Sequence, residues 1–174
     1  EEPMPLYIIP DRKVSLADVR EGMRNHYEGT ELSMTNDPGA GVYKVPYRWR
    51  PMTFKSEGRE YFNERAIATQ QTGFVLIAQM RSWLPDAVGG ILWFGVDDAN
   101  TAVLTPMYTS ITEIPECYHR GNGSMTEFSW TSAFWIHNWV ANMAYNRYEP
   151  MIRDIRPVQK ELEDSYVDLV KNTD

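Results

Sequence analysis

The sequence predicts an α+β fold in which an antiparallel sheet packs against helices. Two observations support this class. Short apolar segments separated by turn residues follow one another within 68–108, whereas the flanking segments carry apolar residues at helical spacing. The length of 174 residues and a hydrophobic content of 43% fit one compact unit. We therefore expect a single unit with a helix and loops over 1–67, antiparallel strands over 68–108 and helices over 126–174.

The first predicted helix covers 14–30. Ser15 can cap its start, Asp18 stands where a capping box places an acid, and Gly29 is expected to close it. Its apolar stripe is expected to face the core and consists of Leu16, Val19, Met23 and Tyr27.

Residues 31–59 predict a long loop, because Pro and Gly recur throughout the segment. Loops of this length are often functional. Arg48 and Arg50 flank Trp49, so a guanidinium there could bind a carboxylate. A surface loop anchored by its aromatic residues is the favoured interpretation.

Three strands are predicted at 73–81, 91–96 and 102–108. The first is apolar on both faces, which is typical of a strand buried on both sides. The link 97–100 reads as a hairpin turn and makes the second and third strands antiparallel. Its adjacent acids Asp97 and Asp98 are interpreted as solvated turn residues rather than as a catalytic pair.

Two helices are predicted after the strands. Residues 129–148 contain no helix breaker and carry a broad apolar surface, as expected for a deeply packed helix. Residues 151–172 form the last helix, which Pro157 either kinks or restarts at Val158.

Charge and motifs exclude several functions. The net charge of −7 argues against nucleic acid or an anionic membrane as the main partner, and the apolar run 74–80 is far too short to span a membrane. The three histidines are widely separated, and no metal, phosphate-loop or dinucleotide motif is present. Cys117 is the single cysteine and lies in a turn-rich loop near His119, so we interpret it as a structural or incidental thiol.

The candidate binding residues lie around the first strand. Gln79 and Arg81 end it on the same face, where an Arg could pair with a substrate carboxylate and a Gln amide could orient a peptide. A purely structural role at the strand end explains both equally well. Arg65 is a third candidate just before the strand, although on its own it fits a surface charge.

Most of the chain resembles one enzyme family through blocks in a fixed order. They are IIPDRKVSLADVREGMRNHYEGTELSM, YRWRPM, ERAIATQQTGFVLIAQMRSWLPDAVGGILWFGVDD, TPMY and FWIHNWVANMAYNRYEPMIRDIRPVQKELED. Together they resemble the N-terminal-nucleophile cysteine dipeptidases, a family that includes the secernins.

The resemblance implies a four-layer αββα sandwich and hydrolysis of dipeptides without a metal or organic cofactor. It implies that a cysteine at the first residue of the mature protein attacks, with its own α-amino group as base. This chain begins with Glu1, and Cys117 does not match that position. We therefore expect no catalytic residue here, an inactive isolated chain, and a nucleophile in the remainder of the same polypeptide.

The implied substrate carries an ammonium and a carboxylate. We expect Gln79, Arg81, Arg65 and Asp86 to bind it, with Arg81 and Asp86 as the pair for its two charges. Two alternatives stay open: an amide-bond acylase of the same fold group, or a non-catalytic binding module using the six Trp, ten Tyr and six Phe. A homo-oligomer is possible, and either a cytoplasmic or an exported location fits the sequence.

Overall fold

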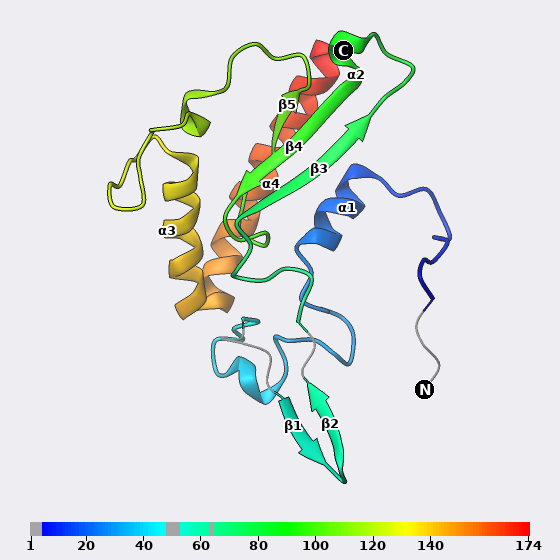
Figure 1. Cartoon of the computed structure of the whole chain (residues 1–174), viewed down its shortest axis with the longest axis vertical. Coiled ribbons are helices and arrows are strands. Elements are labelled where there is room, and N and C mark those ends of the chain that lie inside the picture. The colour runs from blue at the N-terminus through cyan, green and yellow to red at the C-terminus, as the bar shows by residue number, and fades with distance from the viewer. Residues whose placement is uncertain (1–4, 48–52, 63–64) are drawn as a thin grey trace.

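A computed structural model describes residues 5–47, 53–62 and 65–174, and it confirms the predicted α+β class (Figure 1). The two arginines that could bind a carboxylate, Arg48 and Arg50, lie outside the described residues, as does Trp49 between them. The elements in chain order are α1 Leu16–Met23, the 3₁₀ turn η1 Pro38–Ala40, β1 Thr53–Ser56, β2 Arg59–Phe62, β3 Phe74–Met80, α2 Asp86–Gly89, β4 Gly90–Val96, β5 Thr105–Tyr108, the 3₁₀ turn η2 Glu116–Tyr118, α3 Ala133–Asn146 and α4 Tyr148–Thr173.

The three predicted strands form one antiparallel sheet in the order β3-β4-β5, as the sequence predicted. Ile77 lies opposite Trp93, and Trp93 lies opposite Pro106 on the edge strand β5. This strand begins at Thr105, later than predicted, because the preceding backbone bonds to α4 instead of to β4. The Ala102 carbonyl accepts from Gln159 Nε2 at 2.6 Å, and the Leu104 N–H donates to Glu163 Oε1 at 2.9 Å.

Helices α1 and α4 cover one face of this sheet, and α4 runs behind the strands along their length in Figure 1. The core on this face is built from strand residues that are at most 9% exposed: Val75, Ile77, Ile91 and Trp93. On the other face Phe74, Leu76 and Met80 are 63%, 44% and 70% exposed. The prediction that β3 is buried on both faces is therefore wrong for the described residues, because the alternate side chains of the strand lack a covering layer there.

Helix α1 begins as predicted and ends early. The Ser15 side chain accepts from the Asp18 N–H, and the Asp18 carboxylate accepts from the Ser15 N–H, which completes the capping box. The helix stops at Met23 rather than near Gly29. Asn25 Oδ1 accepts the Tyr27 N–H at 2.7 Å, and Tyr27 has a φ of 63°, so the backbone turns away from the helical path.

The two C-terminal helices are continuous segments separated by a bend at Arg147. Pro157 lies inside α4 without ending it. The prediction of a deeply packed α3 is wrong: Trp139 and Met143 are 54% and 50% exposed. The buried positions of this helix are its alanines, Ala133, Ala141 and Ala144, whose small size lets the helix approach its neighbours closely.

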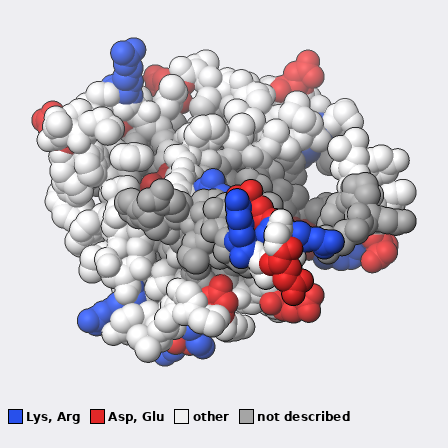
Figure 2. Space-filling model, turned by 60° about the horizontal axis from the view of Figure 1, so that its bottom comes forward, with Lys and Arg blue, Asp and Glu red and all other residues white. Residues whose placement is uncertain are grey.

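An additional two-stranded hairpin, β1–β2, lies where the sequence predicted only loop. Glu57 and Gly58 have φ values of 50° and 75°, the pattern of a tight two-residue turn. Figure 2 views the molecule from the side on which the hairpin projects in Figure 1, and positive and negative side chains are intermixed there. Within the described residues, no helix combines the length and the apolar character needed to cross a membrane.

Candidate functional site

The loop between β4 and β5 forms a buried polar layer under α4. Asp98 and Asn100 are 0% exposed and Asp97 is 7% exposed. The interpretation of Asp97 and Asp98 as solvated turn residues is therefore wrong. The reason is that polar side chains of α4 bind the carbonyls of this loop and hold it inside the fold.

Asn100 connects three parts of the chain through this layer. Its Nδ2 donates to the Arg24 carbonyl at 2.8 Å, and its Oδ1 accepts the Tyr148 hydroxyl at 3.1 Å. Its carbonyl accepts from Arg156 Nη1 at 3.1 Å and from Gln159 Nε2 at 3.2 Å. The end of α1, the β4–β5 loop and α4 are thus fixed relative to one another.

The acids of the loop have unusual electrostatics. Asp98 Oδ2 accepts the Tyr47 hydroxyl at 2.9 Å and the Thr101 hydroxyl at 2.9 Å. Burial raises the pKa of Asp98 and that of Asp97, although these hydrogen bonds oppose the rise at Asp98. One oxygen of each acid, Asp97 Oδ2 and Asp98 Oδ1, is buried without a hydrogen-bond partner among the described residues. Asp97 also has a φ of 69°, in the left-handed region.

His26 lies beside this layer and ties it to an acid at the surface. Its ring is 0% exposed and meets the edges of the Tyr47 and Tyr148 rings at centroid distances of 5.4 and 5.9 Å. Its Nδ1 is 3.0 Å from Glu28 Oε1, and its backbone N–H donates to Glu28 Oε2 at 2.5 Å. Burial acts to raise the pKa of Glu28, but the hydrogen bonds from His26 outweigh it and hold the pKa below its ordinary value.

A buried charge triad lies next to Asn100. Arg24 donates to both carboxylate oxygens of Glu163, with Nη1 at 3.0 Å from Oε2. Arg20 Nη1 is 3.8 Å from Glu163 Oε2, and its guanidinium stacks over the Trp93 ring at 4.4 Å. Because arginine stays protonated in proteins, two cations share one anion and the triad carries a net positive charge.

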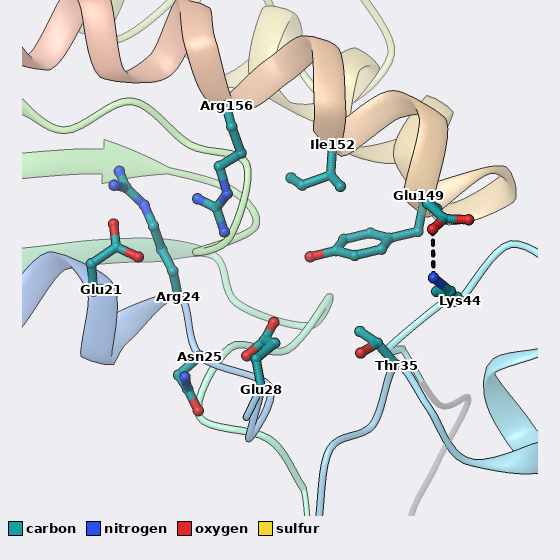
Figure 3. A pocket seen from close by; sticks show the side chains of 10 residues that line it. Glu21, Arg24, Asn25, Glu28, Thr35, Lys44, Glu149, Ile152 and Arg156 are labelled. Carbon is teal, nitrogen blue, oxygen red and sulfur yellow. Dashed lines mark hydrogen bonds and ion pairs between the residues drawn. The ribbon is translucent and has the colours of Figure 1, made fainter. Parts of the chain in front are cut away.

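A cleft opens above the triad, between α1 with its following loop and the first turns of α4 (Figure 3). Its main hollow has a volume of about 410 Å³, and an adjoining hollow of about 240 Å³ extends it along α4. The two hollows share Glu21, Arg24 and Arg156. The other charged side chains that line them are Arg20, Glu28, Lys44, Glu149, Lys160, Glu163 and Asp164.

The charges in this cleft are balanced in number, five cationic and five anionic among the lining residues. Most are paired within the fold: Lys44 Nζ lies 2.6 Å from Glu149 Oε1, and Lys160 pairs with Asp164. Arg156 uses Nη1 for its two hydrogen bonds, which leaves Nη2 without a partner in the described part of the chain. The Glu21 carboxylate likewise has no partner among residues 5–47, 53–62 and 65–174. Figure 3 shows Arg156 pointing into the cleft from α4 and Glu21 and Glu28 reaching it from the opposite wall.

The structure places the predicted Gln79 and Arg81 on the covered face of β3 and inside the fold. Gln79 Oε1 accepts from Trp93 Nε1 at 2.9 Å. Arg81 is 6% exposed, forms an ion pair with Asp174 and donates to the Val88 carbonyl of α2. The two side chains share a face, as expected, and both are already hydrogen-bonded.

The other two predicted residues lie at opposite ends of β3. Asp86 is exposed at the first position of α2, just beyond Arg81. Arg65 lies before the start of the strand, where Nη2 donates to Thr69 Oγ1 at 3.1 Å and to Gln71 Oε1 at 2.5 Å. None of the four lines the cleft, and their assignment to substrate binding stays a prediction.

The remaining reactive side chains show no catalytic arrangement in the part of the chain that the structure describes. Burial raises the pKa of the Cys117 thiol, which lowers its thiolate fraction at neutral pH. His137 uses both ring nitrogens, since Nδ1 donates to the Ala133 carbonyl at 2.7 Å and Nε2 accepts the Val103 N–H at 3.2 Å. No three His, Cys, Asp or Glu residues among those described are grouped so as to hold a metal ion.

Comparison with known proteins gives a consistent result. The model of peptidase family C69 matches residues 1–161. A probable dipeptidase of Latilactobacillus sakei is 26% identical over 145 residues, which cover 83% of this chain and 26% of that protein. Dipeptidase A of Lactobacillus helveticus is 22% identical over 168 residues, which cover 95% of this chain and 29% of that protein. A probable dipeptidase of Salmonella dublin is 29% identical over 107 residues, which cover 62% of this chain and 20% of that protein. The chain thus spans about a quarter of the length of these relatives.

Proposed function

Because the chain belongs to peptidase family C69, we propose that it forms part of a dipeptidase, an enzyme that hydrolyses the peptide bond of dipeptides. The family match over residues 1–161 is the observation that carries the proposal, and it confirms the resemblance seen in the sequence. The names of the relatives, probable dipeptidase and dipeptidase A, support the same activity.

The proposed nucleophile is a cysteine thiol with its own α-amino group as general base. The thiolate attacks the peptide carbonyl, the amine of the second amino acid leaves with a proton, and water hydrolyses the resulting thioester. Cys117 is not assigned this role, because its pKa is raised and the resemblance requires a free α-amino group on the same residue. We place the nucleophile in the remainder of the same polypeptide.

The finer architecture is also a proposal. We infer that the three-stranded sheet belongs to a four-layer αββα sandwich, in which a second sheet would cover Phe74, Leu76 and Met80. The exposure of these apolar side chains supports the inference, since a contiguous apolar surface of this kind is typical of an interface.

Gln79, Arg81, Arg65 and Asp86 remain the proposed substrate-binding residues from the sequence. Arg81 holds α2 through its backbone N–H, which donates to the Gly89 carbonyl at 2.7 Å, and through its guanidinium on Val88. Replacing the Arg81 side chain keeps the backbone bond to Gly89 but removes the guanidinium contact with Val88 and the ion pair with Asp174. In the complete polypeptide we expect Arg81→Gln to lower kcat/KM for dipeptides by roughly ten- to a thousandfold; unchanged kinetics would rule the assignment out.

The function is tested by assaying the complete natural polypeptide against a dipeptide panel, acyl amides such as penicillin V and glycine-conjugated bile salts, and immobilised glycans. We expect hydrolysis of dipeptides, inactivation by iodoacetamide, and full activity in Cys117→Ser. Hydrolysis of acyl amides alone would favour the acylase. Glycan or peptide binding without any hydrolysis would favour the binding module.

A further inference from the structure

We propose that the cleft between α1 and α4 binds a zwitterionic short peptide, with Arg156 on its carboxylate and Glu21 on its ammonium group. The choice of a peptide as ligand rests on the proposed dipeptidase function. The location and the two named residues rest on the charges, contacts and shape of the cleft. This assignment is an alternative to the pair Arg81 and Asp86, which do not line the cleft, because one dipeptide cannot place its two charged groups on both pairs at once.

The cationic side chains of the cleft differ in whether they already have partners. Arg24 is held by Glu163, and Lys44 by Glu149. Arg156 is different, since its Nη2 has no partner in the described residues and the side chain points into the cleft (Figure 3). A guanidinium that presents a free N–H edge can bind a carboxylate through charge-assisted hydrogen bonds.

The acidic side chains of the cleft also differ in whether they already have partners. Glu28 already accepts two hydrogen bonds from His26, and Glu149 is paired with Lys44. The carboxylate of Glu21 has no partner among the described residues, although it lines both hollows. Among the described lining residues, Arg156 on α4 thus keeps Nη2 without a partner and Glu21 on α1 keeps an unpaired carboxylate, on opposite walls (Figure 3).

Positive charge is concentrated beneath the cleft. Arg24 Nε and two nitrogens of Arg20 are buried without hydrogen-bond partners in the described part of the molecule. With Glu163 as the single acid of this triad, a net positive charge lies under the Arg156 side of the cleft. A carboxylate on Arg156 would be attracted by that charge, and partial burial weakens the screening by water.

The charges that line the cleft favour a ligand that carries both signs. A phosphate would meet Glu21 and Glu28, and a metal ion or polyamine would meet Arg24 and Arg156. Equal numbers of both signs favour a molecule that itself carries both. The main hollow of about 410 Å³ lies in the range of small-molecule sites, and Ile152 beside Arg156 offers an apolar contact for a substrate side chain (Figure 3).

The test measures how strongly the complete polypeptide prefers a substrate with a free carboxylate over one without it. The kcat/KM for Ala-Ala is compared with that for its C-terminal amide, which lacks the carboxylate. We expect Arg156→Gln to lower kcat/KM for Ala-Ala by about 10- to 100-fold and that for the amide by less than about threefold. Arg156→Lys, which keeps the charge, should restore part of the discrimination. The matched control is Arg153→Gln, an exposed arginine one turn earlier on α4 that does not line the cleft, and it should behave as wild type.

Glu21→Gln tests the other end in the same way, with Ala-Ala compared with its N-formyl derivative, and Glu31→Gln is the exposed control. Arg156 also holds Asn100 and Gln159, so the melting temperature of each variant is measured. If Arg156→Gln lowered kcat/KM equally for Ala-Ala and for its amide, the role of Arg156 would be structural and the proposal would be overturned. A fall of the same size in Arg153→Gln would overturn it as well.

Failure of the proposed function is distinguished by calorimetric titration with Ala-Ala and with alanine. If the polypeptide hydrolyses no dipeptide but binds Ala-Ala more tightly than alanine, and Arg156→Gln abolishes that binding, the cleft proposal stands while the dipeptidase proposal falls. Hydrolysis with unaltered binding in Arg156→Gln, or equal binding of alanine, would overturn the cleft proposal alone.

Discussion

The two faces of the β3-β4-β5 sheet carry similar apolar side chains and have opposite environments. Ile77 is 9% exposed on the face under α1 and α4, whereas its neighbour Leu76 is 44% exposed on the open face. The difference does not come from the strands, which are apolar on both sides. It comes from the covering elements: α1 and α4 pack over the Ile77 side, whereas on the other side Tyr118 of η2 reaches Phe94 of β4 and leaves Leu76 of β3 exposed.

The covered face is also the polar one. Arg20 stacks on Trp93, Gln79 accepts from its indole, and Glu163 holds Arg24 beneath the cleft. This face therefore combines apolar burial with charges that need their partners, whereas the open face is mainly apolar and carries no charged side chain on β3. Loss of a single partner should therefore destabilise the protein most on the covered side.

The largest effect is expected for Glu163→Ala. Its carboxylate pairs with Arg24, approaches Arg20 and accepts the Leu104 N–H, so its removal leaves two guanidiniums buried without an anion. We expect a loss of about 3–5 kcal/mol in the free energy of unfolding, measured by urea denaturation of the complete polypeptide. Glu161→Ala, at an exposed position of the same helix, should change it by less than about 0.5 kcal/mol. A comparable result for both would show that the triad contributes little.

The next effect compares neighbours on opposite faces. Ile77→Ala should cost about 2–4 kcal/mol, because it removes core contacts and leaves a cavity. Leu76 is 44% exposed in this chain, but the proposed second sheet covers it in the complete polypeptide, so Leu76→Ala should cost a similar amount there. A loss of less than about 1 kcal/mol, measured by the same denaturation, would show that the open face stays in contact with solvent and would contradict the four-layer sandwich.

The smallest effect concerns Asp97 and pH. Burial raises the pKa of Asp97 in the folded state above the pKa that Asp97 has in the unfolded chain. Between these two pKa values the folded protein keeps a proton that the unfolded chain has lost. Stability from this group is therefore greatest at low pH and is lost as pH rises towards the raised pKa. Asn does not ionise, and it tolerates the positive φ of residue 97. The increase in the free energy of unfolding of Asp97→Asn over wild type should therefore be larger at pH 7 than at pH 3.

The measurement is the free energy of unfolding of both proteins at several pH values. Asp154→Asn, at an exposed position on α4, is the control and should run parallel to wild type. A gain for Asp97→Asn that is independent of pH would contradict the assignment of this shift to Asp97.

Local signals in the sequence predicted much of the fold. The Ser15–Asp18 capping box lies within four residues, and the strands alternate with turn residues, so short-range rules suffice for both. The hairpin at Glu57 and Gly58 was missed because its flanking residues are charged and show no apolar alternation. The early end of α1 was missed although its cause is local, because Asn25 accepts the Tyr27 N–H two residues on and Tyr27 takes a positive φ, which the apolar spacing of the segment does not indicate.

The candidate site could be predicted only in part, because its contacts join segments that are distant in sequence. Gln79 and Arg81 share a face because strand periodicity is fixed, yet the ion pair of Arg81 is made by Asp174 from the far end of α4. The cleft was missed because its charges come from α1 and α4, which are distant in sequence. One signal was available: Arg156, Gln159 and Glu163 recur at helical spacing, so polar residues occupy the stripe of α4 that faces the sheet.

The length and position of α4 also affect how the protein folds during its synthesis. This helix covers the sheet, yet it is translated after it: about 65 residues separate Tyr108 at the end of β5 from Thr173. At roughly 5–20 residues per second the ribosome needs about 3–13 s to complete that stretch. Throughout this interval α4 is missing from the covered face, where only α1, translated before the strands, is available to pack. The incompletely covered sheet is then a target for chaperones and for aggregation. We therefore expect the rate of translation across residues 109–173 to affect the yield of folded protein.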